Sequence, residues 1–579
     1  MGGAWVAAFS LLLFFLAYRY YSRFLAEKIY KLEPGAMTPA HRYNDGQDYV
    51  PANRWVLWGH HFTSIAGAAP IVGPAIAIYW GWLPAILWVV LGTIFAAGVH
   101  DFGTLVLSIR NEGQSIGVLA DRLVGHRARL LFLFIILILV LMINAVFAWV
   151  IANLFTSFPA SVLSIFIQIP LAVWIGFRVY RSQGRLVIPS LIVLCVMYFA
   201  AIIASYEPAL QIDFVQYFGG AEANVLFGFN GMEMAFLSWI AILMTYVYIA
   251  SILPVWTLLQ PRDFINSYQL ILGLAILYLG LFTLNPEITA PSTNPEVQDV
   301  GWFPLLFVTI ACGAISGFHG LVSSGTTAKQ LDKETDARFV GYLGAIGEGT
   351  LALITIIAIA TFFGSSGEFL GEYASFNQAS DIGLTVFVEA AAQLATGLMI
   401  PPAAAETIIA VIVISFAATT LDTSVRLMRY IINELGAEYK VQPLTWLHTS
   451  TFLAVGSSAA LVMIPEGPHG VGSGGYVLWP LFGTSNQLLA GISLLLVTIW
   501  LKRRGRNVAY TLLPMIFLLF MTIWAMAEHV FFEWSGWGAA EGNALLFVFG
   551  ALILGFAIWI ILEAIRLMGR PDKEFIDKG

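Results

Sequence analysis

Long apolar runs alternate with short polar connections along almost the whole chain. Each run has roughly the 20 residues that an α-helix needs to cross a hydrocarbon core of about 30 Å. Sixteen such runs can be marked, at residues 4–26, 55–79, 83–108, 129–156, 159–177, 186–205, 235–259, 264–284, 302–324, 340–363, 380–398, 404–432, 445–464, 477–500, 508–532 and 543–567. The connections between them are too short to hold a separate soluble domain.

Composition points to the same fold class. Hydrophobic residues make up 59% of the chain and charged residues 11%, whereas about 25% of residues are charged in a typical soluble domain. We therefore predict an all-α polytopic membrane protein. The two cysteines, Cys195 and Cys312, both lie in apolar runs. We interpret them as small apolar side chains rather than as a disulfide or a metal site.

The basic residues predict how the chain crosses the membrane. No Lys or Arg precedes the first apolar run, and Arg19, Arg23, Lys28 and Lys31 follow its start, which is the reverse of a cleavable signal peptide. If 380–398 does not cross by itself, all 28 Lys and Arg fall on one side, while connections such as 206–234 carry acidic residues only. Because positive charge marks the cytoplasm, we predict about fifteen transmembrane helices, an external N-terminus and a cytoplasmic C-terminus. The segment 380–398 is then re-entrant or lies at the outer surface.

Three regions follow from this map: a first helix with its cytoplasmic connector at 1–54, a core at 55–435, and C-terminal helices with a tail at 436–579. Within the connector at 115–127, Ile116, Leu119 and Leu123 share one helical face opposite basic side chains. This pattern predicts a short helix at the cytoplasmic interface, although a plain surface connector fits it nearly as well.

One stretch, GHHFTSIAGAAPIVGP at residues 59–74, places histidines and helix breakers inside an apolar run. The breaking residues Gly67, Ala68, Ala69 and Pro70 fall near the middle of the predicted span. Non-helical backbone at that depth persists only where it is buried in protein or lines a watery cavity. Broken helices form the substrate sites of many secondary transporters, so we predict that these four residues bind substrate. A proline kink made for packing is the competing interpretation.

Other polar residues lie at a similar depth in or next to four further predicted helices. Charged groups in a membrane face a bundle interior, water or one another. We therefore predict that this layer holds a coupling ion or forms a gate, against the alternative of a structural polar cluster. Its members are His60, His61, His100, Asp101, His319, Ser323, Ser324, Thr326, Thr327, Glu348 and Asp422.

Four motifs carry a family resemblance over residues 53–506: GHHFTSIAGAAPIVGPAIA, GAISGFHGLVSSGTTAKQLDKETDARFVGY, TTLDTSVRLMRY and WPLFGTSNQLLAG. They resemble the carbon starvation protein A family of bacterial nutrient transporters. The resemblance implies uptake of peptides or pyruvate across the inner membrane, driven by protons. It also implies membership of the amino acid–polyamine–organocation superfamily, whose core contains two inverted five-helix repeats.

The predicted topology is compatible with inverted repeats, because 55–79 enters from inside and 235–259, five spans later, enters from outside. In that superfamily the first and eighth core helices often flank a cation site, which here brings in Ser323 and Ser324. The coupling ion is therefore H⁺ or Na⁺. We favour H⁺ because histidines and carboxylates gather in the layer. The prediction includes no cofactor.

Other functions fit less well. His60, His61, His100 and His319 are also candidate haem ligands of a membrane redox subunit, and a channel needs an open pore. The glycine run at 470–475 lacks the Lys-Ser/Thr ending of a nucleotide-binding loop. We expect a transporter rather than an enzyme, with the lipid bilayer and a small-molecule substrate, peptide or pyruvate, as partners and no nucleic acid. The sequence leaves the substrate and the oligomeric state open.

The role of Asp422 has two explanations. In the first, Asp422 joins Asp101 and His60 or His61 in a proton-responsive inner gate, because their three helices bring them to a shared depth. In the second, Asp422 forms a local ion pair with Arg426, four residues further along the same helix.

Overall fold

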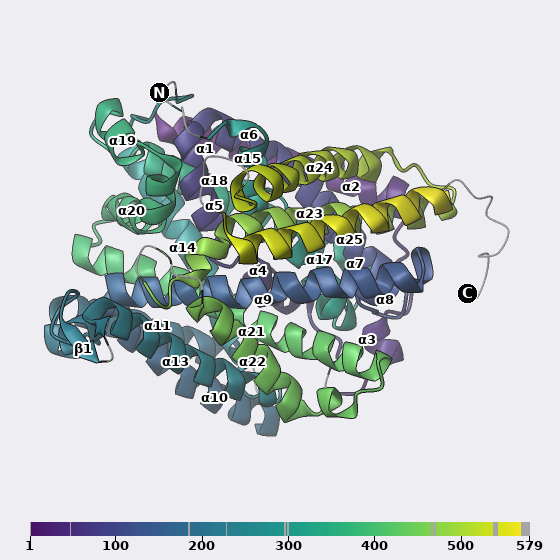
Figure 1. The fold of residues 1–579 in the computed structure, drawn as a ribbon, viewed down its shortest axis with the longest axis horizontal. Coiled ribbons are helices and arrows are strands. Elements are labelled where there is room, and N and C mark those ends of the chain that lie inside the picture. The colour runs from purple at the N-terminus through teal and green to yellow at the C-terminus, as the bar shows by residue number, and fades with distance from the viewer. Residues whose placement is uncertain are drawn as a thin grey trace.

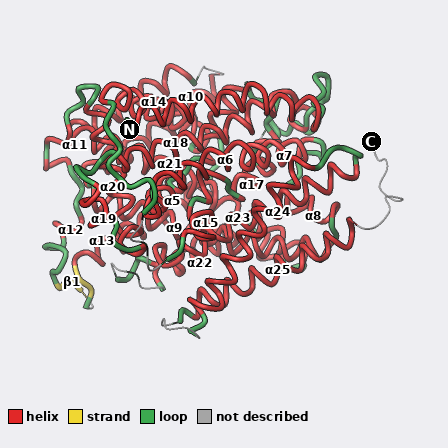
Figure 2. Tube along the Cα trace, turned by 90° about the horizontal axis from the view of Figure 1, so that it is seen from above, coloured by secondary structure: helices red, strands yellow, loops and turns green. Residues whose placement is uncertain are grey.

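The computed structural model describes residues 2–568 except 47, 183–185, 227, 295–296, 298–299, 465–466, 468–469 and 537–541. Nearly all of this is helix, and the long helices run side by side along one axis (Figures 1 and 2). Within the described ranges the sheet content is one hairpin, β1 (Asn224–Leu226) with β2 (Phe229–Asn230). The predicted all-α class is confirmed.

The α-helices are α1 (Gly3–Leu16), α2 (Ser22–Phe24), α3 (Pro39–Arg42), α4 (Arg54–Ile65), α5 (Ala69–Ala77), α6 (Trp82–Gly92), α7 (Gly98–Ile109), α8 (Ile116–Leu123), α9 (His126–Ser157), α10 (Val162–Ser182), α11 (Val187–Tyr206), α12 (Phe214–Tyr217), α13 (Gly231–Ile252), α14 (Leu259–Leu284), α15 (Trp302–Thr309), α16 (Ala311–Ala314), α17 (Gly317–Gly325), α18 (Leu343–Ala360), α19 (Ser366–Glu372), α20 (Phe376–Thr396), α21 (Pro402–Glu438), α22 (Leu447–Met463), α23 (Gly474–Arg503), α24 (Ala509–Glu528) and α25 (Ala544–Met568). Short 3-10 or π segments extend several of them, and η7 (Thr327–Lys329) and η11 (His529–Trp534) belong to the regions discussed below.

Among the described residues, twelve helical stretches are long and apolar enough to cross a membrane, and the bent pair α4–α5 makes a thirteenth span. Two more of the predicted spans are helical but differ from this pattern. Residues 302–324 are broken into α15, α16 and α17, and α22 has only 17 residues. The protein is therefore a multi-pass membrane protein. Segment 380–398 lies in α20, which is not among the thirteen spans, and its re-entrant placement stays a prediction.

The first break interrupts the span that carries the paired histidines. Asn53 caps α4 by accepting a hydrogen bond from the Trp55 backbone N–H at 2.9 Å, and α4 ends at Ile65. Ala66 leaves helical geometry, and α5 starts at Ala69 after a bend of 47°. Pro70 is the second residue of α5, where a backbone N–H has no helical acceptor, so proline fits without loss of a hydrogen bond.

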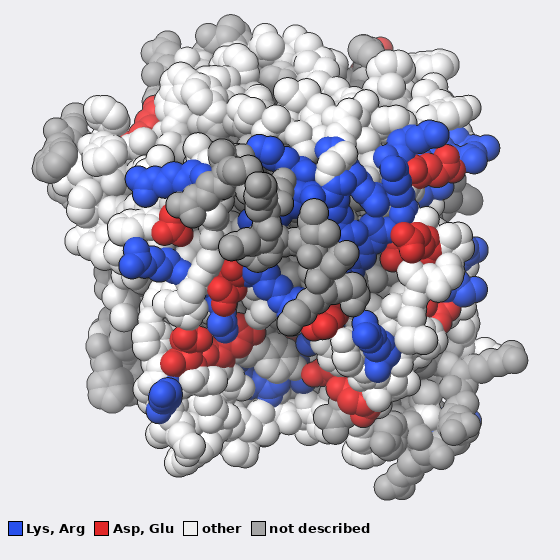
Figure 3. Space-filling model, turned by 90° about the vertical axis from the view of Figure 1, so that its right-hand side faces the viewer, with Lys and Arg blue, Asp and Glu red and all other residues white. Residues whose placement is uncertain are grey.

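Basic side chains from distant parts of the sequence gather at one end of the molecule (Figure 3). Arg110 after α7 pairs with Glu334 at 2.5 Å, and Arg129 on α9 lies 3.3 Å from Glu438 at the end of α21. Arg503 donates to the Leu123 carbonyl of α8 at 2.8 Å. This end of the bundle is therefore the face on which the sequence predicted the positive charges to collect. The predicted cytoplasmic tail at 569–579 lies outside the described residues.

The predicted connector helix exists as α8. Ser115 caps it by accepting from the Val118 N–H, and the face with Ile116, Leu119 and Leu123 is buried, largely against α9. The helical part of that prediction is confirmed, whereas its position relative to the membrane stays a prediction.

Candidate functional site

Two broken helices meet inside the bundle at their breaks. Gly313, in the distorted turn α16, has φ +100°, and a Cβ there would lie 3.5 Å from the Pro70 Cα of α5 and 2.6 Å from the Ala352 Cβ of α18. The site needs glycine for both its left-handed conformation and this close approach. The motifs that contain residues 59–74 and 313–327 are therefore adjacent in space although they lie far apart in the sequence.

The second break depends on a side chain from α23. Asn486 donates from Nδ2 to Ser316 Oγ and Cys312 Sγ, both at 3.0 Å, and its Oδ1 accepts from the Phe318 backbone N–H at 2.9 Å. Asn486 thus forms hydrogen bonds with polar groups at the start of α17 that lack partners within the helix because of the break. Cys312 is buried, as predicted for a small apolar side chain, but it also takes part in this polar contact.

Four titratable side chains form a continuous buried chain, which we call the His–Asp–His–Glu network. His100 and Asp101 come from α7, His319 from α17 and Glu348 from α18, and each is at most 1% exposed. Asp101 Oδ1 lies 2.7 Å from His100 Nδ1, and its Oδ2 lies 2.8 Å from His319 Nδ1. His319 Nε2 lies 3.2 Å from Glu348 Oε2.

The geometry of these contacts limits where the protons of the network can lie. An ionised carboxylate only accepts hydrogen bonds, so both histidines donate Nδ1–H to Asp101. A neutral His319 would then present its Nε2 lone pair to the Glu348 carboxylate, and two acceptors repel. One proton is therefore shared between His319 and Glu348, either on the imidazole or on the carboxyl group.

Asp422 belongs to a second cluster, separate from Asp101. The Asp422 carboxylate on α21 pairs with Arg262 on α14 and accepts from the Tyr246 hydroxyl on α13 at 2.8 Å. Both charged side chains are nearly fully buried. Arg426 instead donates to the Ala250 and Leu253 carbonyls at 2.9 and 2.8 Å, at the end of α13. The alternative of a local Asp422–Arg426 ion pair is therefore wrong, because Arg426 caps a neighbouring helix.

The paired histidines of α4 point to different partners. His60 Nδ1 lies 3.0 Å from Asp263 Oδ2 on α14, next to Arg262 in the sequence. His61 Nδ1 lies 2.9 Å from Thr327 Oγ1 of η7, and His61 is fully buried. The predicted gate residues thus come together in two groups, with α4 between the network and the Arg262–Asp422 cluster.

The hydroxyl residues of the predicted layer differ in their availability. Ser324 accepts from the Ile116 N–H at 3.0 Å and donates to the Gly320 carbonyl, so it helps to hold the start of α8. Thr326 bonds to the Val322 carbonyl of its own helix. Ser323 Oγ is buried and has no hydrogen-bond partner among the described residues. Within the same residues, no cluster of three or more His, Cys, Asp or Glu side chains is arranged to hold a metal ion.

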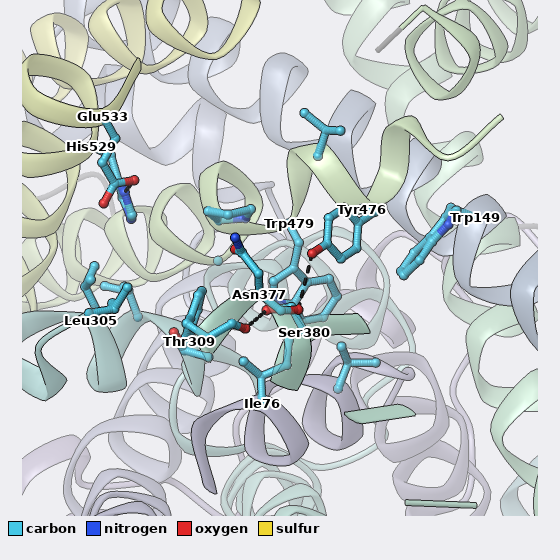
Figure 4. A pocket seen from close by; sticks show the side chains of 17 residues that line it. Ile76, Trp149, Leu305, Thr309, Asn377, Ser380, Tyr476, Trp479, His529 and Glu533 are labelled. Carbon is cyan, nitrogen blue, oxygen red and sulfur yellow. Dashed lines mark hydrogen bonds and ion pairs between the residues drawn. The ribbon is translucent and has the colours of Figure 1, made fainter. Parts of the chain in front are cut away.

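A cavity of about 510 Å³ opens in the half of the bundle away from the basic end. Its walls come from α5, α9, α15, α20, α23 and η11. Figure 4 shows Asn377, Ser380, Thr309, Tyr476 and Trp479 gathered around it, with His529 and Glu533 at one edge. The residues that line it are Val72, Ile76, Trp149, Val300, Leu305, Val308, Thr309, Phe376, Asn377, Ser380, Tyr476, Val477, Trp479, Pro480, Gly483, His529 and Glu533.

The cavity is mostly apolar and aromatic, with one acidic position. His529 Nδ1 lies 2.6 Å from Glu533 Oε2, and the His529 ring stacks on Trp534. No Lys or Arg is among the described residues that line it. The described lining of the cavity therefore holds one acidic side chain, paired with His529, and no Lys or Arg.

The predicted substrate residues do not line this cavity. Gly67, Ala68, Ala69 and Pro70 are buried, and the same span contributes Val72 and Ile76 instead. A methyl group at Gly67 would lie 2.5 Å from Thr420 Oγ1 and 2.8 Å from Phe147 Cε1. Close packing against α21 and α9 is thus sufficient to require glycine at position 67, and substrate binding by these four residues stays a prediction.

Several residues of these sites were missed by the sequence analysis. Arg262 was counted with the cytoplasmic connections, yet it lies buried within α14; an Arg-Asp pair at the edge of an apolar run was the available signal. Asn486 lay in a motif without an assigned role. Tyr246, Thr309 and the aromatic residues of the cavity carry no distinctive sequence signal, since such residues are common in membrane helices.

Broken helices packed at their breaks, buried ionisable side chains and an adjoining cavity define a polytopic membrane protein of the transporter type. Residues 2–369 and 366–525 match the family described as Carbon starvation protein CstA, and the chain belongs to this family.

Three relatives show which transporters the chain is similar to. The chain is 31% identical to the pyruvate/proton symporter BtsT of Escherichia coli, over 91% of this chain and 81% of the relative. It is 32% identical to the peptide transporter CstA of Helicobacter pylori, over 90% and 81%, and 29% identical to the peptide transporter CstA of Bacillus subtilis, over 99% and 98%.

The haem alternative gains no support from these findings. His60, His61, His100 and His319 contact carboxylates or a hydroxyl through Nδ1, and they lie in two different clusters. The named relatives are transporters.

Proposed function

We propose that this protein is a secondary active transporter that imports short peptides together with protons across the bacterial inner membrane. The observation that carries the proposal is the arrangement of the second broken helix. Its first part, α15, lines the cavity, and its last part, α17, carries His319 of the buried network. Occupancy of the cavity and protonation of the network therefore act on one discontinuous helix.

The orientation follows from the charges. If the basic face lies in the cytoplasm, as the positive-inside rule requires, the cavity opens toward the outside and the network lies deeper. The N-terminus is then external, and substrate enters the cavity before the proton is released inward. This order gives uptake rather than export.

Volume and charge favour a peptide over pyruvate. Pockets of roughly 300–1,000 Å³ hold ligands of drug size, and the cavity of about 510 Å³ falls in that range. Pyruvate is much smaller and carries only a negative charge, whereas a peptide brings an ammonium group that Glu533 can attract. The aromatic walls suit varied side chains without strict selection.

Counterflow in proteoliposomes tests the substrate. Purified protein is loaded with unlabelled dipeptide, tripeptide or pyruvate, and entry of each labelled compound is measured. We expect exchange with the peptides and little with pyruvate. Exchange with pyruvate alone would replace the peptide by that carboxylate and leave the transporter class intact.

A second measurement addresses the coupling ion. Uptake should persist without sodium and collapse with a protonophore, because the network binds protons. Sodium-dependent, protonophore-resistant uptake would instead favour a cation site at Ser323, whose hydroxyl has no partner among the described residues.

A further inference from the structure

One end of the His–Asp–His–Glu network is open. His100 Nδ1 is occupied by Asp101, but His100 Nε2 is buried and has no hydrogen-bond partner within the described part of the chain. Ser493 Oγ, on the neighbouring helix α23, is in the same condition. Both residues are at most 1% exposed. Buried polar atoms without partners are rare, and ordered water commonly satisfies them.

His100 Nε2 and Ser493 Oγ both lie close to the backbone of α17 at Gly320, which has no side chain. A Cβ on Gly320 would lie 3.1 Å from His100 Nε2 and 3.4 Å from Ser493 Oγ. The two polar atoms are therefore no further apart than the sum of these two distances, and no side chain of Gly320 lies between them. Two hydrogen bonds of about 2.7–3.2 Å through one water oxygen span a separation of this size, so one molecule beside Gly320 is able to bridge the pair.

The hydrogen-bonding capacity of the two side chains matches water. A neutral His100 that donates Nδ1–H to Asp101 has a lone pair on Nε2, which needs a donor. The Ser493 hydroxyl can donate or accept. A water between them donates to Nε2 and exchanges one hydrogen bond with Ser493. A sodium ion fits less well, because His100 Nε2 is a nitrogen ligand, whereas hard cations prefer oxygen ligands.

We propose that a bound water between His100 Nε2 and Ser493 Oγ is the port through which the network exchanges its coupling proton. This rests on the proton-coupled transport proposed above. In the entry step the water, protonated as hydronium, gives one proton to Nε2 and remains as water. His100 becomes an imidazolium that faces the Asp101 carboxylate, and release runs in reverse.

The port is separate from the substrate cavity. Ser493 lies ten residues after Gly483, which lines the cavity, and this separation along a helix is about 15 Å. A change at the port should therefore alter proton coupling without removing a substrate contact.

Two variants test the port, each with a control on its own helix. Ser493→Ala removes the hydroxyl, and Ser485→Ala is its control, because the Ser485 hydroxyl bonds to the Leu481 carbonyl. Gly320→Ala places a methyl group at the port. Gly325→Ala is its control, because its added Cβ meets Leu427 at an ordinary 3.6 Å.

The readouts are initial uptake driven by a pH gradient and substrate counterflow without a gradient. We expect both port variants to slow gradient-driven uptake roughly a hundredfold, the lower end of the range for a positioned proton-transfer group, while counterflow and the controls stay at the wild-type rate. Equal slowing of uptake and counterflow would overturn the port, as would unchanged gradient-driven uptake in Ser493→Ala.

A direct observation of the water separates this proposal from the proposed function. Cryo-electron microscopy of the reconstituted wild type at high resolution should show density bridging His100 and Ser493, which Gly320→Ala removes. Lack of that density in the wild type would overturn the port even if transport is proton-coupled. A wild type that accumulates substrate without proton coupling would instead refute the proposed function, whether or not the density is present.

Discussion

The cavity away from the basic end and the buried His–Asp–His–Glu network differ in almost every physical respect. The cavity is a space of about 510 Å³ with aromatic walls and one acidic edge. The network has at most 1% exposure and pairs its carboxylates with imidazoles over 2.7–3.2 Å. In the proposed transport function, the first region binds the substrate and the second binds the coupling proton, so each region can be altered by mutation separately from the other.

The broken helix α15–α17 connects the two regions, and Asn486 holds its break. Changes in the network should therefore alter the coupling of transport to protons, and changes in the cavity should alter the affinity for substrate. Variants in each region test whether this division holds.

The largest effect is expected from Glu348→Gln in the network. A glutamine keeps the size of the side chain but cannot exchange the proton that His319 and Glu348 share. Accumulation driven by a pH gradient should be lost, while counterflow of substrate continues close to the wild-type rate. Glu389→Gln on the partly exposed face of α20 is the control. Preserved accumulation in Glu348→Gln would break the assignment of ion coupling to the network.

The next effect concerns stability at the Arg262–Asp422 cluster. Arg262→Met leaves the Asp422 carboxylate buried without its cation, which should lower the free energy of unfolding by about 3–5 kcal/mol. Thermal unfolding in lipid nanodiscs measures the loss. Arg262→Met combined with Asp422→Leu should recover much of it, because neither charge then remains buried alone. A double variant as unstable as the sum of both single variants would show that the pair does not act as a unit.

A smaller effect is expected at the first break. Gly67→Ala brings a methyl group into contact with Thr420 and Phe147, and such overpacking destabilises by about 1–3 kcal/mol. Adding Thr420→Ala should restore part of the melting temperature. If the single variant is fully stable but has lost affinity for substrate, the break binds substrate. The substrate-binding region would then include residues 67–70 as well as the cavity.

The smallest effect belongs to the cavity. Glu533→Gln should raise the KM for peptides with a free ammonium group about tenfold, the equivalent of roughly 1.4 kcal/mol, and leave kcat unchanged. N-acetylated peptides should show no such rise. Glu528→Gln, at the last residue of α24 and directly before His529, serves as the control. A rise that is equal for both kinds of peptide would mean that Glu533 supports the wall and does not select charge.

Hydropathy and charge were sufficient to predict most of the architecture. Apolar runs predicted the helices because lipid forces backbone groups to bond within a segment, and glycine and proline predicted the break at 66–68. The second break, near Gly313, was not predicted, because residues 302–324 were interpreted as one continuous span. The same reasoning brought His100, Asp101, His319 and Glu348 into one layer, and the structure places them in contact.

The sequence did not reveal which buried side chains pair with one another. Spacing along one helix favoured Arg426 as the partner of Asp422, but Arg262 from α14 takes that place. Depth alone cannot tell which helices are neighbours, so His60 and Asp101 were assigned to one gate although they have different partners. The cavity could not be predicted either, because its shape depends on packing among six elements and its wall residues are common ones.

The longest helices of the bundle exceed the thickness of the bilayer. α9 has 32 residues and α21 has 37, which at 1.5 Å per residue give lengths of about 48 and 56 Å. The hydrocarbon core is only about 30 Å thick, so these helices tilt or project beyond it. The most apolar part of α21 is 94% buried in protein, against 67% for α9, so of these two helices α9 is the more exposed to mismatch with the lipid. The length of the lipid acyl chains should therefore affect the shape of the cavity. In a thicker membrane α9 should tilt less, and this change would move Trp149, which lies on α9 and lines the cavity.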